Sequence, residues 1–145
     1  MYTIRTLTTV SELYALADVF ARAFESAYPL TDTYATQVVS DKRQCILGAW
    51  LDTTLVGGLV AYEMQPLHGT KEFYIYDIAV DPAHQKRGIG TMLLTQLESE
   101  ARARGIGTIC VEAEADDDGA VAFYRSLQGE EIAVRHFNFK VLDEH

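Results

Sequence analysis

The stretch Asp81-Pro82-Ala83-His84-Gln85-Lys86-Arg87-Gly88-Ile89-Gly90 decides the fold of this chain. The apolar run before it, Phe73 to Val80, is typical of a buried strand, and Thr91 to Glu98 has apolar residues at helical spacing. A Gln-x-x-Gly-x-Gly loop therefore joins a strand to the N-terminus of a helix. Glycines let a backbone come close to a ligand, and the unpaired N–H groups of a first helical turn favour an anion, most simply a pyrophosphate.

Two familiar phosphate-binding loops fit this position less well. A Walker loop requires Gly-Lys-Ser/Thr, which the sequence lacks. A dinucleotide loop requires a third glycine, where this chain has Leu93, and it follows its strand directly, whereas seven residues separate Val80 from Gly88. Glu112 or Glu114 could still act as the downstream acid of such a loop. A glycine-containing connection that binds nothing is a further alternative, which two glycines alone would favour but the whole arrangement does not.

Strand, Asp-Pro, basic loop, Gln-x-x-Gly-x-Gly and helix together resemble the pyrophosphate loop of the GCN5-related N-acetyltransferases (the GNAT superfamily), which bind acetyl-CoA. Two more stretches are similar to the aminoglycoside 3-N-acetyltransferases of that superfamily. Tyr74 to Val80 resembles their central strand, and Asp117 to Tyr124 resembles their Asp-Asp-Pro-Ala-Val-Ala-Leu-Tyr motif, with Gly119 in place of the proline. His136-Phe137 is similar to their final strand, and the resemblance extends over about residues 55–139.

The order of the expected elements, β-α-α-β-β-β-α-β-α-β, matches the fold of that superfamily. The sequence therefore predicts the α/β class, with one GNAT domain over residues 1–145 and a mixed central β-sheet flanked by helices. The expected strands are Met1–Leu7, Gln44–Leu51, Leu55–Met64, Lys71–Val80, Ile109–Val111 and Ile132–Val141. The expected helices run from an N-cap at Ser11 to Ser26, over Thr31–Ser40, from Thr91 to Arg104, and over Ala120–Leu127 with Asp118 as the cap.

Composition limits the classes of function. The apolar content of 48% and charged content of 23% are ordinary for a soluble globular protein. No apolar run approaches the length of a membrane span, and Met1 to Thr6 is not followed by the apolar core of a signal peptide. We therefore expect a cytoplasmic protein that has no membrane partner. Cys45 and Cys110 both lie in strand-like runs, which indicates buried, reduced thiols, and their spacing offers no metal site.

The formal net charge of −9 argues against nucleic acid as a partner. The charge is segregated along the chain. Lys86 and Arg87 lie in the glycine loop, with Arg102 and Arg104 near the end of the following helix. The acids gather in a later stretch: Glu112, Glu114, Asp116, Asp117 and Asp118. Such a field would attract a cationic second substrate, although a negative surface also serves solubility alone.

The resemblance implies which residues hold acetyl-CoA, the co-substrate. The backbone of the central strand would contact pantetheine and the thioester oxygen, through Ile78, Ala79 and Val80. The loop and the first helical turn would hold the pyrophosphate, through Gln85, Lys86, Arg87, Gly88, Ile89, Gly90 and Thr91. The alternatives are an ordinary buried strand and solvated surface charges.

Asp77 is an acid inside a strongly apolar strand, where charged residues rarely stand without a partner. Partial burial would raise its pKa, which suits a general base or a group that binds the amine substrate. The alternative is a structural aspartate paired with an arginine or with backbone amides. By resemblance, Tyr124 matches the tyrosine that protonates the CoA thiolate; the alternative is an aromatic core residue.

Three more acids are expected to bind the substrate. Glu112 and Glu114 share one face of their strand, because side chains alternate, and could receive ammonium groups. Asp117 lies in the following turn and could act likewise, whereas Asp118 is more simply a helix cap.

Together these features predict an acetyl-CoA-dependent N-acetyltransferase that modifies the 3-amino group of aminoglycosides, as an antibiotic-resistance enzyme would. Strand burial makes Cys45 and Cys110 poor nucleophiles, which favours direct transfer in a ternary complex. The alternatives are the same fold acting on a polyamine, a peptide N-terminus or another small amine, and a non-catalytic acyl-CoA-binding module. The sequence leaves open whether the chain forms a homodimer.

Overall fold

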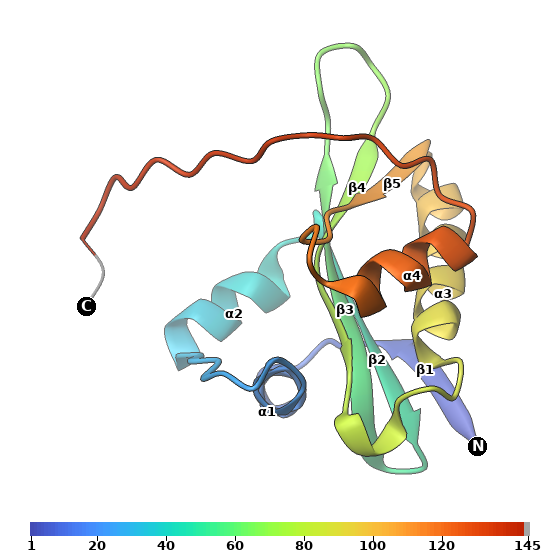
Figure 1. The fold of residues 1–145 in the computed structure, drawn as a ribbon. Coiled ribbons are helices and arrows are strands. Elements are labelled where there is room, and N and C mark those ends of the chain that lie inside the picture. Colours follow the sequence, from blue (N-terminus) through green and yellow to red (C-terminus); the bar gives the residue numbers. More distant parts are fainter. Residues whose placement is uncertain (144–145) are drawn as a thin grey trace. The chain divides into compact units, whose positions relative to one another are not determined.

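The computed structural model describes residues 1–143, and the chain divides into two compact units, Met1–Glu112 and Ala113–His145. The first unit contains β1 (Tyr2–Thr6), α1 (Val10–Phe24), α2 (Asp32–Ser40), β2 (Gln44–Leu51), β3 (Thr54–Met64), β4 (Glu72–Val80), the 3-10 turn η1 (Pro82–His84), α3 (Ile89–Arg104) and β5 (Thr108–Val111). The second unit contains α4 (Asp118–Ser126). Figure 1 labels the strands β1–β5 and the helices α1–α4.

The sheet of the first unit has the strand order β1-β2-β3-β4-β5. The first four strands are antiparallel neighbours, joined by short connections or, between β1 and β2, by the helical pair α1 and α2. β5 is parallel to β4, which requires a long crossover, and α3 supplies it. The predicted fold class, a mixed sheet flanked by helices, is confirmed.

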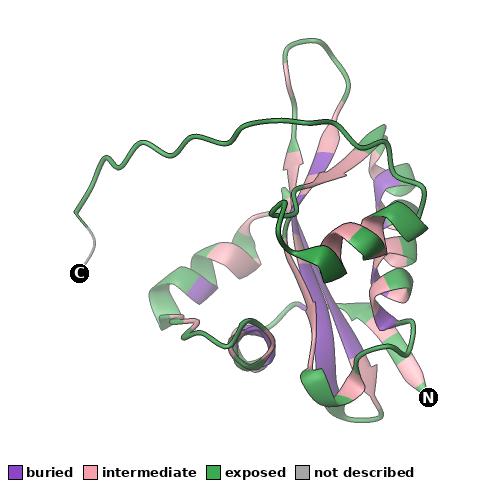
Figure 2. Cartoon of the chain, in the orientation of Figure 1, coloured by how far each residue is buried: buried purple, intermediate pink, exposed green. Residues whose placement is uncertain are grey.

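Helices cover both faces of this sheet, with α1 and α2 on one side and α3 on the other (Figure 1). On the α3 face, Leu93 and Leu97 pack against Leu47, Leu59 and other fully buried strand residues. The opposite face carries a second apolar core, with α1 residues against the strands. The buried residues accordingly lie along the strands and on the sides of α1 and α3 that face them (Figure 2).

Two cross-strand glycines set how closely α1 approaches the sheet. Gly48 of β2 is the register partner of Gly58 of β3. A Cβ atom on Gly58 would overlap the side chain of Leu16 on α1, and one on Gly48 would meet Leu7. Consecutive glycines inside a strand favour a bulge or a close backbone approach, and both occur here: the close approach is at Gly58, and the register between β2 and β3 shifts next to Gly57.

Two helices begin at caps other than those predicted. The N-cap of α1 is Thr9, not Ser11, and it forms a capping box: Glu12 N–H donates to Thr9 Oγ1 at 3.2 Å, and Thr9 N–H donates to Glu12 Oε1 at 3.2 Å. The glutamate three residues after Thr9 was the signal in the sequence. α4 is capped by Asp117, which accepts from Ala120 N–H at 3.1 Å, and Asp118 is its first residue.

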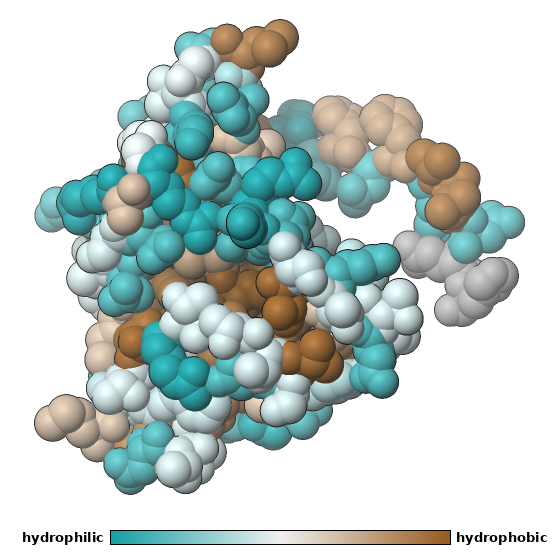
Figure 3. Space-filling view, turned by 180° about the vertical axis from the view of Figure 1, so that it is seen from behind, coloured by the Kyte–Doolittle hydropathy of each residue, from teal (hydrophilic) through white to brown (hydrophobic). Residues whose placement is uncertain are grey.

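The prediction of strands over Ile132–Val141 is wrong for this structure. Residues 129–141 have no regular secondary structure. A strand needs a neighbour to accept and donate its backbone hydrogen bonds, and within residues 113–143 no strand is present to supply one. The apolar side chains of this stretch are exposed: Ile132, Val134, Phe137, Phe139, Val141 and Leu142. Figure 3 shows tan and brown side chains along the segment that leads to the grey residues.

None of the helices in the described part of the chain has the length and apolar character needed to span a membrane.

Candidate active site

The second half of β4 has one edge that β5 does not cover. β4 and β5 pair from Glu72 opposite Thr108 to Ile75 opposite Val111. β4 then continues to Val80 with only β3 beside it. Apart from the Val80 oxygen, which accepts from Gln85, backbone N–H and C=O groups that point to the open edge between residues 76 and 80 are therefore available to an extended ligand. This is the part of the strand, Ile78 to Val80, that the sequence predicted to contact pantetheine.

A β-bulge lies at the start of this open stretch. Val60 of β3 is opposite Asp77, but the next residue, Ala61, is opposite Ile75, so Tyr76 has no register partner. A bulge changes where the following side chains point. Tyr76 is 68% exposed, whereas Asp77 is half-buried on the sheet face that α1 covers. The sequence did not predict this bulge.

Asp77 has a partner that the sequence did not identify. The hydroxyl of Tyr28, in the connection between α1 and α2, donates to Asp77 Oδ2 at 2.5 Å. Burial raises the pKa of Asp77 above its usual value, and the hydrogen bond from Tyr28 opposes that increase. The predicted direction is confirmed, but the partner is a phenol rather than an arginine or backbone amides. The contact joins residues 49 positions apart, which no local sequence pattern could indicate.

The N-terminus of α3 differs from the other helix starts. α1, α2 and α4 each begin with a side-chain cap, from Thr9, Thr31 and Asp117. α3 begins after Gly88, which has φ 81°, and no side chain caps it. The N–H groups of its first turn are thus left for a ligand, and the helix dipole favours an anion there.

Two cations stand in the loop before this helix. Lys86 and Arg87 are exposed, and neither forms an ion pair with any residue from 1 to 143. Lys86 has φ 63°, in the left-handed region, which continues the turn into Gly88. An uncapped helix start with two unpaired cations beside it has the electrostatics that a pyrophosphate requires.

The start of the loop is fixed to the rest of the first unit. Arg22 of α1 forms an ion pair with Asp81 at 2.8 Å, and Asp81 also accepts from Ala83 N–H at 3.2 Å. Gln85, predicted to contact pyrophosphate, donates its side-chain amide to the backbone oxygen of Val80 at 3.1 Å. Its side chain therefore braces the loop against the end of β4.

A row of tyrosine rings links two of the predicted acids. Tyr74 donates to Glu112 at 2.7 Å, and this bond, followed by burial, raises the pKa of Tyr74 to about 12. The ring of Tyr74 lies 6.4 Å from that of Tyr76, which lies 6.2 Å from that of Tyr62. The first unit thus presents the carboxylates of Glu112 and Asp77 on an aromatic surface. Sequence reasoning treated these tyrosines only as part of apolar strands.

The remaining predicted residues belong to the second unit. Glu114 is exposed, and one carboxylate oxygen of Asp117 caps α4. Tyr124 lies on α4 with its ring 5.3 Å from that of Phe123, and burial together with the charge of Asp117 raises its pKa. The role of Tyr124 as proton donor and the roles of Glu114 and Asp117 in substrate binding stay predictions.

The model of the acetyltransferase (GNAT) family matches residues 10–129. The chain belongs to this family. The match includes β4, the glycine loop and α3, the elements on which the resemblance was recognised. Acetyl-CoA is the co-substrate of GNAT acetyltransferases, and the open edge of β4 and the uncapped α3 fit its pantetheine and pyrophosphate parts.

Relatives of known sequence include enzymes that acetylate protein N-termini. The N-alpha-acetyltransferase RimI of Mycobacterium tuberculosis is 30% identical over 135 residues, which cover 92% of this chain and 82% of that protein. The [ribosomal protein bS18]-alanine N-acetyltransferase of Salmonella typhimurium is 38% identical over 74 residues, 51% of this chain and 50% of that protein. Against several of its curated relatives, the matched part of the chain spans about half of the relative's length or less.

The structure is also similar to solved acetyltransferases. An aminoglycoside acetyltransferase, HMB0005, from an uncultured soil sample has a TM-score of 0.92 at 31% identity, covering 98% of this chain and 99% of that one. The aminoglycoside acetyltransferase meta-AAC0020, also from soil and in complex with sisomicin, has a TM-score of 0.92 at 27% identity, covering 97% of both chains.

Proposed function

We propose that this chain transfers the acetyl group of acetyl-CoA to a primary amine, with the 3-amino group of an aminoglycoside as the acceptor. One observation carries the proposal: the half-buried carboxylate of Asp77 lies near the start of the stretch of β4 whose edge is not paired with β5. A thioester laid along that edge and an amine held at Asp77 would meet at the end of one strand.

Different residues on and near β4 bind different parts of acetyl-CoA. Backbone groups of Ile78 to Val80 hold pantetheine and orient the thioester oxygen. The N–H groups that follow Gly88, together with Lys86 and Arg87, hold the pyrophosphate. Gln85 acts indirectly, because its side chain already bonds to Val80.

The chemistry assigned to the side chains is one acyl transfer. Asp77 takes a proton from the acceptor ammonium, which frees the nitrogen lone pair to attack the thioester carbonyl carbon. A C–N bond forms, the C–S bond breaks, and Tyr124 supplies a proton to the leaving thiolate. The second proton that the nitrogen loses on becoming an amide restores the Tyr124 hydroxyl. The raised pKa of Asp77 strengthens it as a base. Burial raises the pKa of the Cys45 thiol to about 11, which makes it a poor nucleophile and supports transfer without an acyl-enzyme.

Two observations support an aminoglycoside as the acceptor. The two soil aminoglycoside acetyltransferases match nearly the whole chain at a TM-score of 0.92. In addition, Asp77 and Glu112 offer two carboxylates along one surface, which suits a substrate with several ammonium groups. A peptide N-terminus is the second candidate, because RimI of Mycobacterium tuberculosis matches 92% of the chain at 30% identity.

An acceptor panel tests the proposal. Release of the CoA thiol should be measured with gentamicin-type aminoglycosides, spermidine, a peptide beginning with Ala, and no acceptor. We expect the highest kcat/KM with an aminoglycoside, and NMR of the product should show acetylation at the 3-amine. Turnover restricted to the peptide would overturn the aminoglycoside assignment and favour the RimI-like candidate. Thiol release that no acceptor increases would indicate an acyl-CoA-binding module.

A further inference from the structure

A cavity of about 400 Å3 lies on the face of the sheet that α1 and α2 cover, and Tyr28, the hydrogen-bond partner of Asp77, is one of its lining residues. Its volume falls within the range of about 300–1,000 Å3 that is usual for small-molecule sites. Its walls are apolar side chains of α1, α2, β2 and β3, among them Leu13, Leu16, Phe20, Val38, Ile46 and Val60. No carboxylate lines its interior, so the cavity itself is unsuited to a polyhydroxylated polycation.

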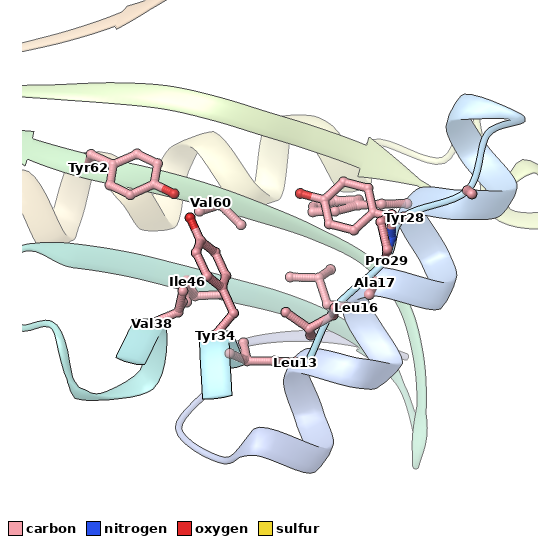
Figure 4. A pocket seen from close by; sticks show the side chains of 13 residues that line it. Leu13, Leu16, Ala17, Tyr28, Pro29, Tyr34, Val38, Ile46, Val60 and Tyr62 are labelled. Carbon is pink, nitrogen blue, oxygen red and sulfur yellow. The ribbon is translucent and has the colours of Figure 1, made fainter. Parts of the chain in front are cut away.

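The mouth of the cavity is polar. Figure 4 shows the hydroxyl groups of Tyr28, Tyr34 and Tyr62 turned toward the same space above Val60, from the α1–α2 connection, α2 and β3. Val60 is the register partner of Asp77, and the Tyr28 hydroxyl donates to the Asp77 carboxylate. One carboxylate therefore lies within a single hydrogen bond of a tyrosine that lines an otherwise apolar cavity.

Two of the rim hydroxyls have unused hydrogen-bonding capacity. Tyr34 and Tyr62 form no side-chain hydrogen bond with any residue in the described range 1–143. Tyr34 is 62% exposed, whereas Tyr62 is half-buried. Tyrosine hydroxyls that turn inward usually find a partner, and the electron-rich faces of their rings attract cations.

We infer that this cavity is a subsite for primary amines that carry a compact apolar or aromatic group next to the amino group, a second acceptor class beside aminoglycosides. The ammonium would lie at the rim, between Asp77 and the tyrosine hydroxyls, and the apolar group would enter between α1 and α2. The inference rests on the proposed function in one respect: Asp77 is the residue at which the reacting amine sits. The transfer itself is the one described above, with the same bonds formed and broken.

Binding and turnover separate this inference from the proposed function. Calorimetry on the full chain in the presence of CoA should compare 2-phenylethylamine with ethanolamine, which has the same ammonium but no apolar group. We expect 2-phenylethylamine to bind at least about tenfold more tightly, because burying a phenyl group removes several CH groups from water. Equal affinities would overturn the subsite. Tight binding without acetylation of any amine would support the subsite and overturn the proposed function.

A matched pair of variants locates the binding. Val38→Phe fills the cavity from α2, and Val39→Phe makes the same change on the same helix at a position that does not line the cavity. Only the first should abolish the preference for 2-phenylethylamine; an equal effect of both would contradict the subsite. Should Val38→Phe fail to fold by circular dichroism, Val38→Ala, which removes part of the apolar wall, should weaken binding of 2-phenylethylamine and leave that of ethanolamine unchanged.

Discussion

The acetyl-CoA side and the amine side of the proposed site differ in which protein groups contact the ligand. In the site proposed above, acetyl-CoA is bound largely by backbone groups, along the open edge of β4 and at the uncapped start of α3. On the amine side it is met by side chains from α1, α2, β3 and β4, held together by tertiary contacts such as the one between Tyr28 and Asp77. A backbone site depends on glycines at fixed positions, whereas a side-chain site changes with single substitutions far apart in the sequence. We therefore expect the cofactor to be constant and the acceptor variable among similar chains.

The largest effect is expected from Asp77→Asn, on the amine side. Asparagine keeps the size of the side chain and still accepts from Tyr28, but it takes no proton at neutral pH. We expect kcat/KM to fall by about 10²-fold or more, with binding of acetyl-CoA retained. Steady-state rates from pH 6 to 8 measure the change in kcat/KM, and calorimetry with CoA measures whether cofactor binding is retained. Turnover close to that of the wild type across this range would show that Asp77 is not the base.

The same variant should gain stability. Burial raises the pKa of Asp77 in the folded state, so the folded chain favours the protonated form, and the stability that protonation provides is lost as pH rises through the folded pKa. At neutral pH the buried carboxylate is therefore destabilising. Asp77→Asn should have a Tm at pH 7 that is equal to or above that of the wild type, and this increase should disappear at a pH low enough to protonate Asp77. A lower Tm at pH 7 would mean that the carboxylate is structurally required.

Gly88→Val tests the backbone side. A side chain at Gly88 would project into the space at the start of α3 and hinder the approach of a pyrophosphate. We expect the Kd for CoA to rise roughly tenfold or more, which corresponds to the loss of about one charge-assisted hydrogen bond. Gly105→Val is the control, because Gly105 ends the same helix with φ 71° and also faces open space, so both variants carry similar backbone strain. Equal losses of CoA affinity in the two variants would disprove the loop assignment.

A smaller effect is expected from Tyr28→Phe. The change removes the hydrogen bond that lowers the pKa of Asp77, so this pKa should rise and the acidic limb of the pH–rate profile should move to higher pH. We expect kcat/KM to fall roughly two- to tenfold at pH 6 and less at pH 8. Tyr14→Phe is matched to it, since Tyr14 donates to Asp32 at 2.5 Å and that pair is exposed. An unshifted pH profile in Tyr28→Phe would separate Tyr28 from the catalytic step.

The smallest effect concerns long-range attraction. Charges on an exposed surface are screened over about 8 Å at physiological salt. The KM for an aminoglycoside should therefore rise about two- to fivefold between low and high ionic strength, while that for a monoamine should barely change. Glu112→Gln should flatten this dependence, and Tyr74→Phe, which keeps the charge of Glu112 but removes a hydrogen bond to it, should not. Equal salt dependence in these two variants would exclude Glu112 from attracting the substrate.

The difference between the two sides also explains what could be predicted from the sequence. β4, the glycine loop and α3 are contiguous, and each is indicated by a local pattern of glycines, apolar residues or cations. The order of these three elements and the position of the loop were therefore predicted correctly. The Tyr28–Asp77 bond and the row of Tyr74, Tyr76 and Tyr62 depend on register and on the bulge in β4, which no local pattern encodes.

Two predictions, the C-terminal strands and the cap of α4, were wrong because a local sequence pattern does not fix which partner a backbone group finds. The alternating apolar residues of Ile132–Val141 satisfy the local requirement for a strand, but a strand also needs a pairing partner, and alternation alone does not provide one. At α4, two consecutive aspartates are equally good caps by composition. The choice of Asp117 over Asp118 was decided by which carboxylate reaches the N–H of Ala120.

α1 takes part in both halves of the site. Through Leu13, Leu16 and Phe20 it forms a wall of the amine cavity, and through Arg22 it holds Asp81 at the start of the phosphate loop. An amine that displaces α1 even slightly would change the free energy of the loop, and thermodynamic reciprocity requires acetyl-CoA to change the affinity for the amine by the same factor. We expect the two substrates to bind cooperatively, with Arg22→Gln reducing the coupling free energy while each substrate still binds alone.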